Sequence, residues 1–203
     1  MAINLSKGQK INLEKKSNAG LGEILVNLNW NSRPVKKSGL AGLFGGMTSA
    51  DIDLDLGCLY EFKDGRKGVV QALGNAFGSL TNPPFIALDG DDRTGESSDG
   101  ENLRINGNQI SQIKRILVYT FIYEGVANWQ QADAVVTIKY PDAEDVVIKM
   151  DAYNNANIMC ALALFENVND ETFSVQKLVQ FYQGHSAMDA AFNWGLNWKS
   201  GRK

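Results

Sequence analysis

The side chains of this sequence that could do chemistry gather in one acidic run, LDGDDRTGESSDGENLRI, at residues 88–105. Its carboxylates are Asp89, Asp91, Asp92, Glu96, Asp99 and Glu101. So many like charges oppose compact folding unless a cation lies among them. Calcium is the obvious cation, because it takes about 6–8 oxygen ligands from carboxylates, carbonyls and water in flexible geometry. A solvated acidic loop is the alternative that the run alone leaves open.

A second acidic cluster lies in DIDLDLGCLYEF at residues 51–62. In a strand, Asp51, Asp53 and Asp55 would share one face, and the apolar residues between them would share the other. These carboxylates must be solvated, paired with lysines or bound to a metal, because burying an unpaired charge is very costly. Taken with the run at 88–105, they predict a cation site shared between neighbouring loops.

The spacing of the acidic run excludes the EF-hand, the commonest calcium-binding loop. Counted from Asp89, position five of that pattern is Arg93 and position twelve is Gly100, where the loop requires oxygen ligands. No helices are expected on either side of the run. Calcium bound by loops at one end of a β-sandwich is the arrangement that remains.

The rest of the sequence offers little for catalysis. His185 is the only histidine, so neither a zinc site nor a nucleophile–histidine–acid triad has support. Neither of the two common glycine-rich phosphate-binding motifs occurs. Cys58 and Cys160 each lie in an apolar run, which predicts buried, reduced and unreactive thiols. We therefore expect a protein that is not an enzyme.

Composition places the chain among ordinary globular proteins. It has 203 residues, 44% of them hydrophobic and 21% charged, with a net charge of −3. That charge gives no attraction to nucleic acid. The first residues lack the apolar core of a secretory leader, and no apolar stretch approaches the roughly 18–20 residues that span a bilayer. With two reduced cysteines, these features predict a cytoplasmic protein.

Alternating apolar and polar residues predict strands along most of the chain. The expected strands lie at residues 2–5, 10–14, 24–30, 52–62, 69–73, 85–88, 103–105, 115–123, 133–140, 145–150, 158–166 and 173–182. The first two are expected to pair as a hairpin, and the strand at 115–123, apolar on both faces, is expected at the centre of a sheet. Short helices are expected at 110–114 and 186–198. Residues 31–50 are rich in glycine and predict an exposed insertion loop.

This pattern predicts an all-β fold, a two-sheet β-sandwich of about ten strands with a few short helices. No linker divides it, so residues 1–203 are expected to form one domain. The calcium-binding loops are expected at one end of the sandwich.

The sequence resembles the TerD-domain family of tellurium-resistance and stress-response proteins, most closely its TerA-type branch. The resemblance rests on INLSKGQKINLEK at 3–15, VNLNW at 26–30, DIDLDLGCLYEF at 51–62 and GDDRTGESSDGENLRI at 90–105. It implies a calcium-binding β-sandwich without catalytic activity that binds one or two Ca²⁺. The ligands it implies are Asp53, Asp55, Asp91, Asp92, Thr94, Glu96, Asp99 and Glu101.

The expected function is that of a calcium-binding stress-response protein implicated in tellurite resistance. It would act as a structural or sensing module in a complex with other proteins of the stress-resistance system, in the cytoplasm or peripherally at the inner membrane face. The alternative is a calcium-dependent membrane- or carbohydrate-binding module. Exposed aromatic residues near the acidic loops, or the apolar residues of the 31–50 loop, would favour that alternative.

Overall fold

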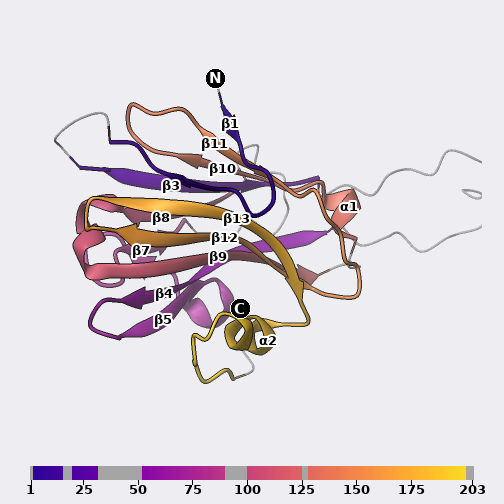
Figure 1. Cartoon of the computed structure of the whole chain (residues 1–203). Helices are drawn as coiled ribbons and strands as arrows, with labels where there is room; N and C mark the ends of the chain where they lie inside the picture. Colours follow the sequence, from indigo (N-terminus) through magenta and orange to yellow (C-terminus); the bar gives the residue numbers. More distant parts are fainter. Residues whose placement is uncertain (1, 16–19, 32–51, 90–99, 125–127, 200–203) are drawn as a thin grey trace, which may run out of the picture.

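The chain folds into two β-sheets that face each other across an apolar core (Figure 1). The structure, a computed structural model, describes residues 2–15, 20–31, 52–89, 100–124 and 128–199. The seven-stranded sheet has the order β1 (Ile3–Asn4), β11 (Val146–Lys149), β10 (Val135–Lys139), β3 (Glu23–Asn29), β8 (Glu101–Asn106), β7 (Ile86–Leu88) and β6 (Gly78–Ser79). The six-stranded sheet has the order β2 (Lys10–Asn12), β13 (Thr172–Tyr182), β12 (Met159–Val168), β9 (Ile113–Glu124), β4 (Asp53–Phe62) and β5 (Lys67–Gln71).

Helices are few and short in the described part of the chain. They are α1 (Trp129–Ala132), α2 (His185–Ala191) and the 3-10 helices η2 (Leu73–Asn75) and η3 (Gly107–Gln112). In Figure 1, α2 lies on the side of the molecule opposite β1, β10 and β11. The prediction of two sheets with little helix is therefore confirmed.

The core forms because apolar residues alternate along the strands of both sheets. Val26 of β3 and Val118 of β9 are fully buried in the same cluster, although they belong to different sheets. On β9, Leu117, Tyr119 and Phe121 alternate with these inward residues and enter a second apolar cluster on the opposite face of the sheet. As predicted, this strand is central and buried on both faces.

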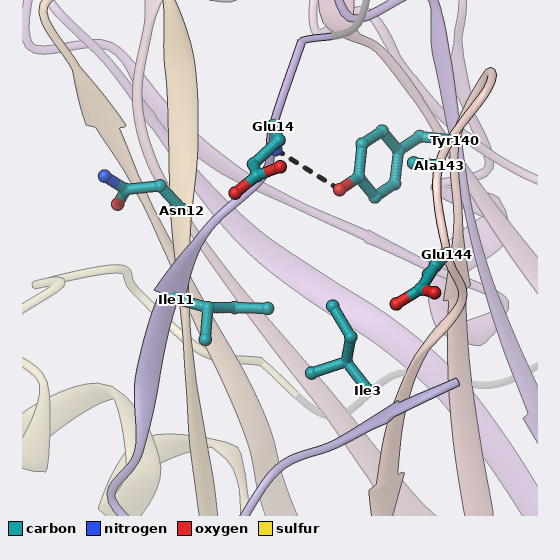
Figure 2. A pocket seen from close by; sticks show the side chains of 7 residues that line it. All are labelled: Ile3, Ile11, Asn12, Glu14, Tyr140, Ala143 and Glu144. Carbon is teal, nitrogen blue, oxygen red and sulfur yellow. Dashed lines mark hydrogen bonds between the residues drawn. The ribbon is translucent and has the colours of Figure 1, made fainter. Parts of the chain in front are cut away.

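The two N-terminal strands do not form the predicted hairpin. β1 pairs in parallel with β11, at Ile3 and Val146, whereas β2 pairs antiparallel with β13, at Ile11 and Val175. The chain crosses between the sheets, and each strand extends the edge of a different one. Leu5 is 4% exposed and lies in the core between them, which explains why the crossing is favourable. Where the two edges diverge, a cavity opens between them (Figure 2).

The remaining local predictions concern the hairpins, the number of strands, the C-terminal helix and the loop at 31–50. The hairpins β4–β5, β10–β11 and β12–β13 are all present. The twelve strand ranges expected from the sequence overlap every strand of the structure except the two-residue β6, so the estimate of about ten strands was low. The helix expected at 186–198 ends at Ala191, because Asn193 (φ 53°) and Gly195 (φ 80°) adopt left-handed conformations that a helix cannot continue. The loop at 31–50 lies, apart from Asn31, outside the described residues.

Candidate metal site

Two of the predicted ligands, Asp53 and Asp55, lie at the start of β4 and are buried. Leu54 and Leu56 alternate with them and point into the core between the sheets. The pleat therefore directs the aspartates to the opposite face of β4. Asp53 is 9% exposed and Asp55 is 0% exposed, so neither belongs to a solvated strand face. Of the alternatives for these two residues, solvation at the strand surface is excluded.

Glu101 brings a third buried carboxylate to the same strand from the other sheet. It is the first residue of β8 and is only 3% exposed. Its Oε2 accepts a hydrogen bond of 2.5 Å from the backbone nitrogen of Leu56, one residue after Asp55. Such a bond to a charged acceptor is stronger than one between neutral groups. This bond joins the start of β8 to the backbone near the start of β4, two segments that lie far apart in sequence.

Gly100 fixes the point at which Glu101 enters the sheet. Its φ is +62°, a conformation that favours glycine. A Cβ atom at this position would lie 2.1 Å from the backbone oxygen of Leu28 on β3. Only glycine allows this close approach, which sets the direction of the Glu101 side chain.

Asp89 occupies a different environment from the three buried carboxylates. It follows β7, and its Oδ2 accepts a 2.5 Å hydrogen bond from Arg104 Nε. Arg104 also pairs with Glu23 at 2.6 Å. The hydrogen bonds to Glu23 and then Asp89 raise the pKa of the guanidinium further. Asp89 is therefore part of a surface ion pair, and its role as a metal ligand stays a prediction.

The remaining predicted ligands lie outside the described residues. They are Asp51, Asp91, Asp92, Thr94, Glu96 and Asp99. Among the residues that the structure describes, no group of three or more histidine, cysteine, aspartate or glutamate side chains is close enough to hold a metal ion. Asp53, Asp55 and Glu101 therefore do not form a three-ligand group by themselves, and the whole predicted ligand set, these three included, stays a prediction.

The chemistry of the described donors fits a hard cation. Asp53, Asp55 and Glu101 offer carboxylate oxygens, the ligand type that Ca²⁺ and Mg²⁺ prefer. Cys58, the thiol nearest in sequence, belongs to the core between the sheets, on the other face of β4. Both cysteines are free and fully buried, and burial raises their thiol pKa far above the ordinary value. The prediction of reduced, buried thiols is confirmed.

A polar group that the sequence did not indicate lies next to Asp55. The Tyr119 hydroxyl donates a 2.6 Å hydrogen bond to Gln71 Oε1, and His185 Nε2 lies 3.0 Å from the same oxygen. Burial, and to a smaller degree electrostatic interaction with the Cys58 and Asp55 side chains, holds the Tyr119 pKa well above its usual range. Burial lowers the pKa of His185 to about 4, so its imidazole is neutral at pH 7.

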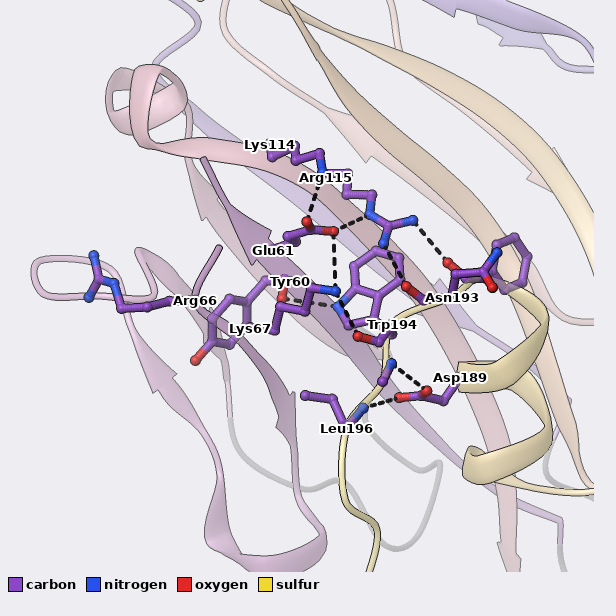
Figure 3. A network of polar contacts seen from close by, with 12 residues as sticks. Tyr60, Glu61, Arg66, Lys67, Lys114, Arg115, Asp189, Asn193, Trp194 and Leu196 are labelled. Carbon is purple, nitrogen blue, oxygen red and sulfur yellow. Dashed lines mark hydrogen bonds and ion pairs between the residues drawn. The ribbon is translucent and has the colours of Figure 1, made fainter. Parts of the chain in front are cut away.

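A second polar network that the sequence did not indicate centres on the buried Glu61 (Figure 3). Glu61 accepts hydrogen bonds from Lys114 Nζ at 2.8 Å and from Arg115 Nε at 2.5 Å. Burial alone would raise the pKa of Glu61, but these two hydrogen bonds and the charges of their donors bring it below its ordinary value.

Arg115 joins this network to the C-terminal segment. Its guanidinium carbon lies 3.8 Å from the ring centre of Trp194, a cation–π contact. It also donates to the backbone oxygens of Phe192 and Asn193 at 3.0 and 3.2 Å, which satisfies carbonyls beyond the end of α2. The Trp194 indole donates to Tyr60 O at 3.1 Å, so the segment is held on β4 as well.

Asp189 holds the residues that follow α2 close to the helix through hydrogen bonds to its side chain. Its carboxylate accepts hydrogen bonds from the backbone nitrogens of Gly195 and Leu196, at 2.7 and 3.0 Å, and from the Trp198 indole at 3.1 Å. Residues 185–198, here called the C-terminal clamp, thereby cover the apolar outer face of the six-stranded sheet. Two tryptophans so close together were the available signal that this tail is packed.

No helix in the described ranges is long and apolar enough to cross a membrane.

Comparison with known proteins places the chain in a family. Residues 1–166 match the model of the TerD domain. The chain is 44% identical over 204 residues to tellurium resistance protein TerA of Alcaligenes sp., covering 99% of this chain and 58% of that protein. It is 32% identical over 142 residues to tellurium resistance protein TerX of Serratia marcescens, covering 62% of this chain and 64% of that protein. The chain thus spans less than two thirds of either relative.

Two solved structures share the fold. One is SAV2460, a protein of unknown function, with a TM-score of 0.62 and 13% identity over 88% of this chain and 99% of that one. The other is SCO6318 of Streptomyces coelicolor A3(2), a homologue of telluride resistance protein (TerD), with a TM-score of 0.55 and 17% identity over 88% of this chain and all of that one. Together with the domain match and the TerA identity, this agreement of fold shows that the chain belongs to the TerD-domain family.

Proposed function

We propose that this chain is a non-enzymatic calcium-binding protein of the cytoplasm that serves tellurite and stress resistance as a structural or sensing module in a protein complex. The observation that carries the calcium assignment is the burial of Asp53, Asp55 and Glu101 at the junction of β4 and β8. The part in tellurite resistance rests on the names of the relatives.

Burial supports a metal because it makes negative charge expensive. Removing a carboxylate from water costs several kcal/mol in a real protein, and neighbouring carboxylates add mutual repulsion. A bound divalent cation offsets both the cost of removing the carboxylates from water and their mutual repulsion. The sequence supplies further oxygen donors next to these residues, since Asp51 lies two residues before Asp53 and Asp99 two residues before Glu101.

In this proposal the three buried carboxylates belong to a cation site that also needs acidic residues outside the described ranges. Asp53 and Asp55 would contribute carboxylates from β4, and Glu101 from β8. Calcium would supply positive charge beside these side chains. Glu101 also accepts a hydrogen bond from the backbone nitrogen of Leu56. An ion that holds the Glu101 carboxylate in place would therefore strengthen this link between the sheets. Ion binding then stabilises the folded state by mass action, by about 2.7 kcal/mol at a free concentration of 100 times the dissociation constant.

Calcium titration of chelator-stripped protein tests the proposal. Calorimetry gives the stoichiometry, and the melting temperature is measured with and without calcium. The Asp53→Asn/Asp55→Asn variant should gain little stability on calcium addition, whereas the parent should gain.

The matched control removes one acidic charge elsewhere. Asp133 is exposed, follows α1 and has a left-handed backbone that asparagine tolerates, so Asp133→Asn should keep the full calcium response. If the melting temperature of Asp53→Asn/Asp55→Asn rises with calcium as much as that of the parent, these aspartates are not ligands.

One observation favours the second candidate, a calcium-dependent membrane- or carbohydrate-binding module. Tyr123 is 39% exposed and precedes Glu124, which pairs with Asp53 in the sheet register. An exposed aromatic ring beside an ion site suits insertion into a lipid surface or stacking on a sugar. Co-sedimentation with anionic liposomes or with an insoluble polysaccharide, dependent on calcium and lost in Tyr123→Ser, would favour this candidate over the first.

A further inference from the structure

A cavity between β1 and β2 lies apart from the candidate metal site. It has a volume of about 490 Å³ and is lined by Ile3, Ile11, Asn12, Glu14, Tyr140, Ala143 and Glu144, none of which is a predicted metal ligand. It exists because β1 extends one sheet and β2 the other, so the sandwich stays open along this edge. Its volume lies within the range of about 300–1,000 Å³ that is typical of small-molecule sites.

Apolar side chains form the facing walls of the cavity. Figure 2 shows Ile3 and Ile11 pointing toward each other across the space, while Asn12 points away from it. Both isoleucines and the ring of Tyr140 are partly buried and pack on the core between the sheets. A ligand with an apolar body would therefore replace water on a surface that is already continuous with the core.

The Tyr140 hydroxyl group has a proton to donate to a ligand in this cavity. Its oxygen accepts a 3.2 Å hydrogen bond from the backbone nitrogen of Glu14, which fixes the position of the group (Figure 2). Among the residues that the structure describes, no group accepts the proton of the hydroxyl itself. Burial raises the pKa of Tyr140, so the phenol keeps this proton at neutral pH. An oxygen atom of a ligand can therefore accept a hydrogen bond here.

The residues around the cavity give a charged ligand little to bind. The described lining contains no lysine, arginine or histidine, so an anion would meet no opposite charge. Glu144 already takes part in an interaction within the protein. Glu14 is exposed, and an exposed carboxylate attracts a cation only weakly because water screens its charge. The lining therefore favours an uncharged ligand.

We propose that this cavity binds an uncharged small molecule that has an apolar body and a carbonyl oxygen. The body would lie between Ile3 and Ile11, and the carbonyl oxygen would accept a hydrogen bond from the Tyr140 hydroxyl. A ketone, an ester and an amide all meet these requirements. The site does not depend on calcium binding at β4 and β8, so it stands or falls separately from the proposed function.

The test is titration of the full chain with 2-heptanone, followed through the NMR signals of the isoleucine methyl groups. The signals of Ile3 and Ile11 should move with ligand concentration, whereas that of Ile148, which is fully buried on β11, should not. Each buried methylene strengthens binding roughly fourfold, so 2-heptanone should bind at least about tenfold more tightly than acetone. Equal affinity for the two ketones, or unmoved signals of Ile3 and Ile11, would overturn the proposal.

Two charged ligands with seven carbons test whether the site prefers an uncharged molecule. Heptanoate and n-heptylamine carry a similar apolar chain, but each has a charged group in place of the ketone. Both should bind more weakly than 2-heptanone. Tighter binding of heptylamine would show a cation site, and tighter binding of heptanoate an anion site; either result contradicts the proposal.

A variant of Tyr140 tests the hydrogen bond. Tyr140→Phe keeps the ring and removes the hydroxyl group, so it should bind 2-heptanone about two- to tenfold more weakly than the parent does. Toluene, which has no carbonyl oxygen, should bind equally to the variant and the parent. If the variant binds 2-heptanone as tightly as the parent, or loses affinity for both ligands alike, the hydroxyl does not contact the ligand and the assignment is wrong.

A variant of Ala143 tests the space itself. Ala143→Phe fills the cavity and should weaken the binding of 2-heptanone and of toluene together. Ala190→Phe adds the same ring at an exposed position of α2 and is the matched control, which should bind both ligands as the parent does. Undiminished binding in Ala143→Phe would place the ligand elsewhere on the protein and refute the proposal.

Discussion

The carboxylate of Glu101 accepts a hydrogen bond from the backbone nitrogen of Leu56 at 2.5 Å, and this bond links β8 of one sheet to β4 of the other. In the sheet order, β5 ends opposite Gly57, so the first residues of β4 extend beyond their neighbour on that side. Glu101 accepts the hydrogen bond of the Leu56 N–H, which lies beyond the end of the β4–β5 pairing. The residue thus has a structural role with or without a metal.

Replacing Glu101 separates these two roles. Glu101→Ala removes the acceptor of the Leu56 nitrogen, and leaving a buried donor unsatisfied costs about 1–3 kcal/mol. Glu101→Gln keeps an acceptor oxygen but removes the charge, so it should cost less and still weaken the calcium response. Urea unfolding without calcium measures the first effect. Equal stability of Glu101→Ala and the parent would mean that the bond contributes nothing.

Trp194 should be among the most sensitive positions outside the main core. It is 1% exposed and contacts Arg115 and the Tyr60 carbonyl. Trp194→Ala should lower the free energy of unfolding by about 3–5 kcal/mol, the usual cost of truncating a buried tryptophan. Trp198, which is only partly buried, is the matched comparison and should cost less. A loss below about 1 kcal/mol at Trp194 would show that the C-terminal clamp is not packed as described.

Glu61 predicts a specific pH dependence. Its pKa is lower in the folded state than in the unfolded chain, through Lys114 and Arg115. The resulting stabilisation is fully present above the unfolded pKa of about 4.3 and is lost as the pH falls through the folded value. The gap in unfolding free energy between the parent and Glu61→Gln should therefore be constant near neutrality and shrink below about pH 4. A gap that stays constant down to pH 3 contradicts this account.

The two cysteines should be unreactive toward thiol reagents in the native protein. Burial raises the pKa of both thiols, so little reactive thiolate exists at pH 7. Ellman's reagent should modify Cys58 and Cys160 only at the rate at which the fold opens, and urea should release both. The Cys58→Ala/Cys160→Ala variant should keep any tellurite-resistance phenotype. Loss of the phenotype in folded protein would point to thiol chemistry.

Sequence patterns predicted the sheets well because local alternation decides which face of a strand is buried. The hairpins β4–β5, β10–β11 and β12–β13 and the central position of β9 all follow from that period. The pattern could not tell which sheet each N-terminal strand joins. Ile3 and Ile11 have the same local signal, and only partners near the other end of the chain distinguish them.

The candidate site was predicted in part for the same reason. Spacing placed Asp53 and Asp55 on one face of a strand, and the structure agrees. Glu101 looked like the end of an acidic loop, whereas it begins β8 and is buried. The network around Glu61 was not predicted, because Glu61 lies on β4, Lys114 and Arg115 lie on β9, and Trp194 follows α2, and only the tertiary fold brings these elements together.

The position of β13 has a consequence for how the chain is made. It lies between β2, from the first dozen residues, and β12, which leaves the ribosome late. Until Tyr182 has been synthesised and released, Ile11 has no strand to pair with, and the six-stranded sheet lacks its link to the N-terminus. Closing such a long chain loop is slow. The nascent protein therefore exposes an incomplete sheet until β13 has been made, and the insertion of β13 joins β2 to the rest of the sheet.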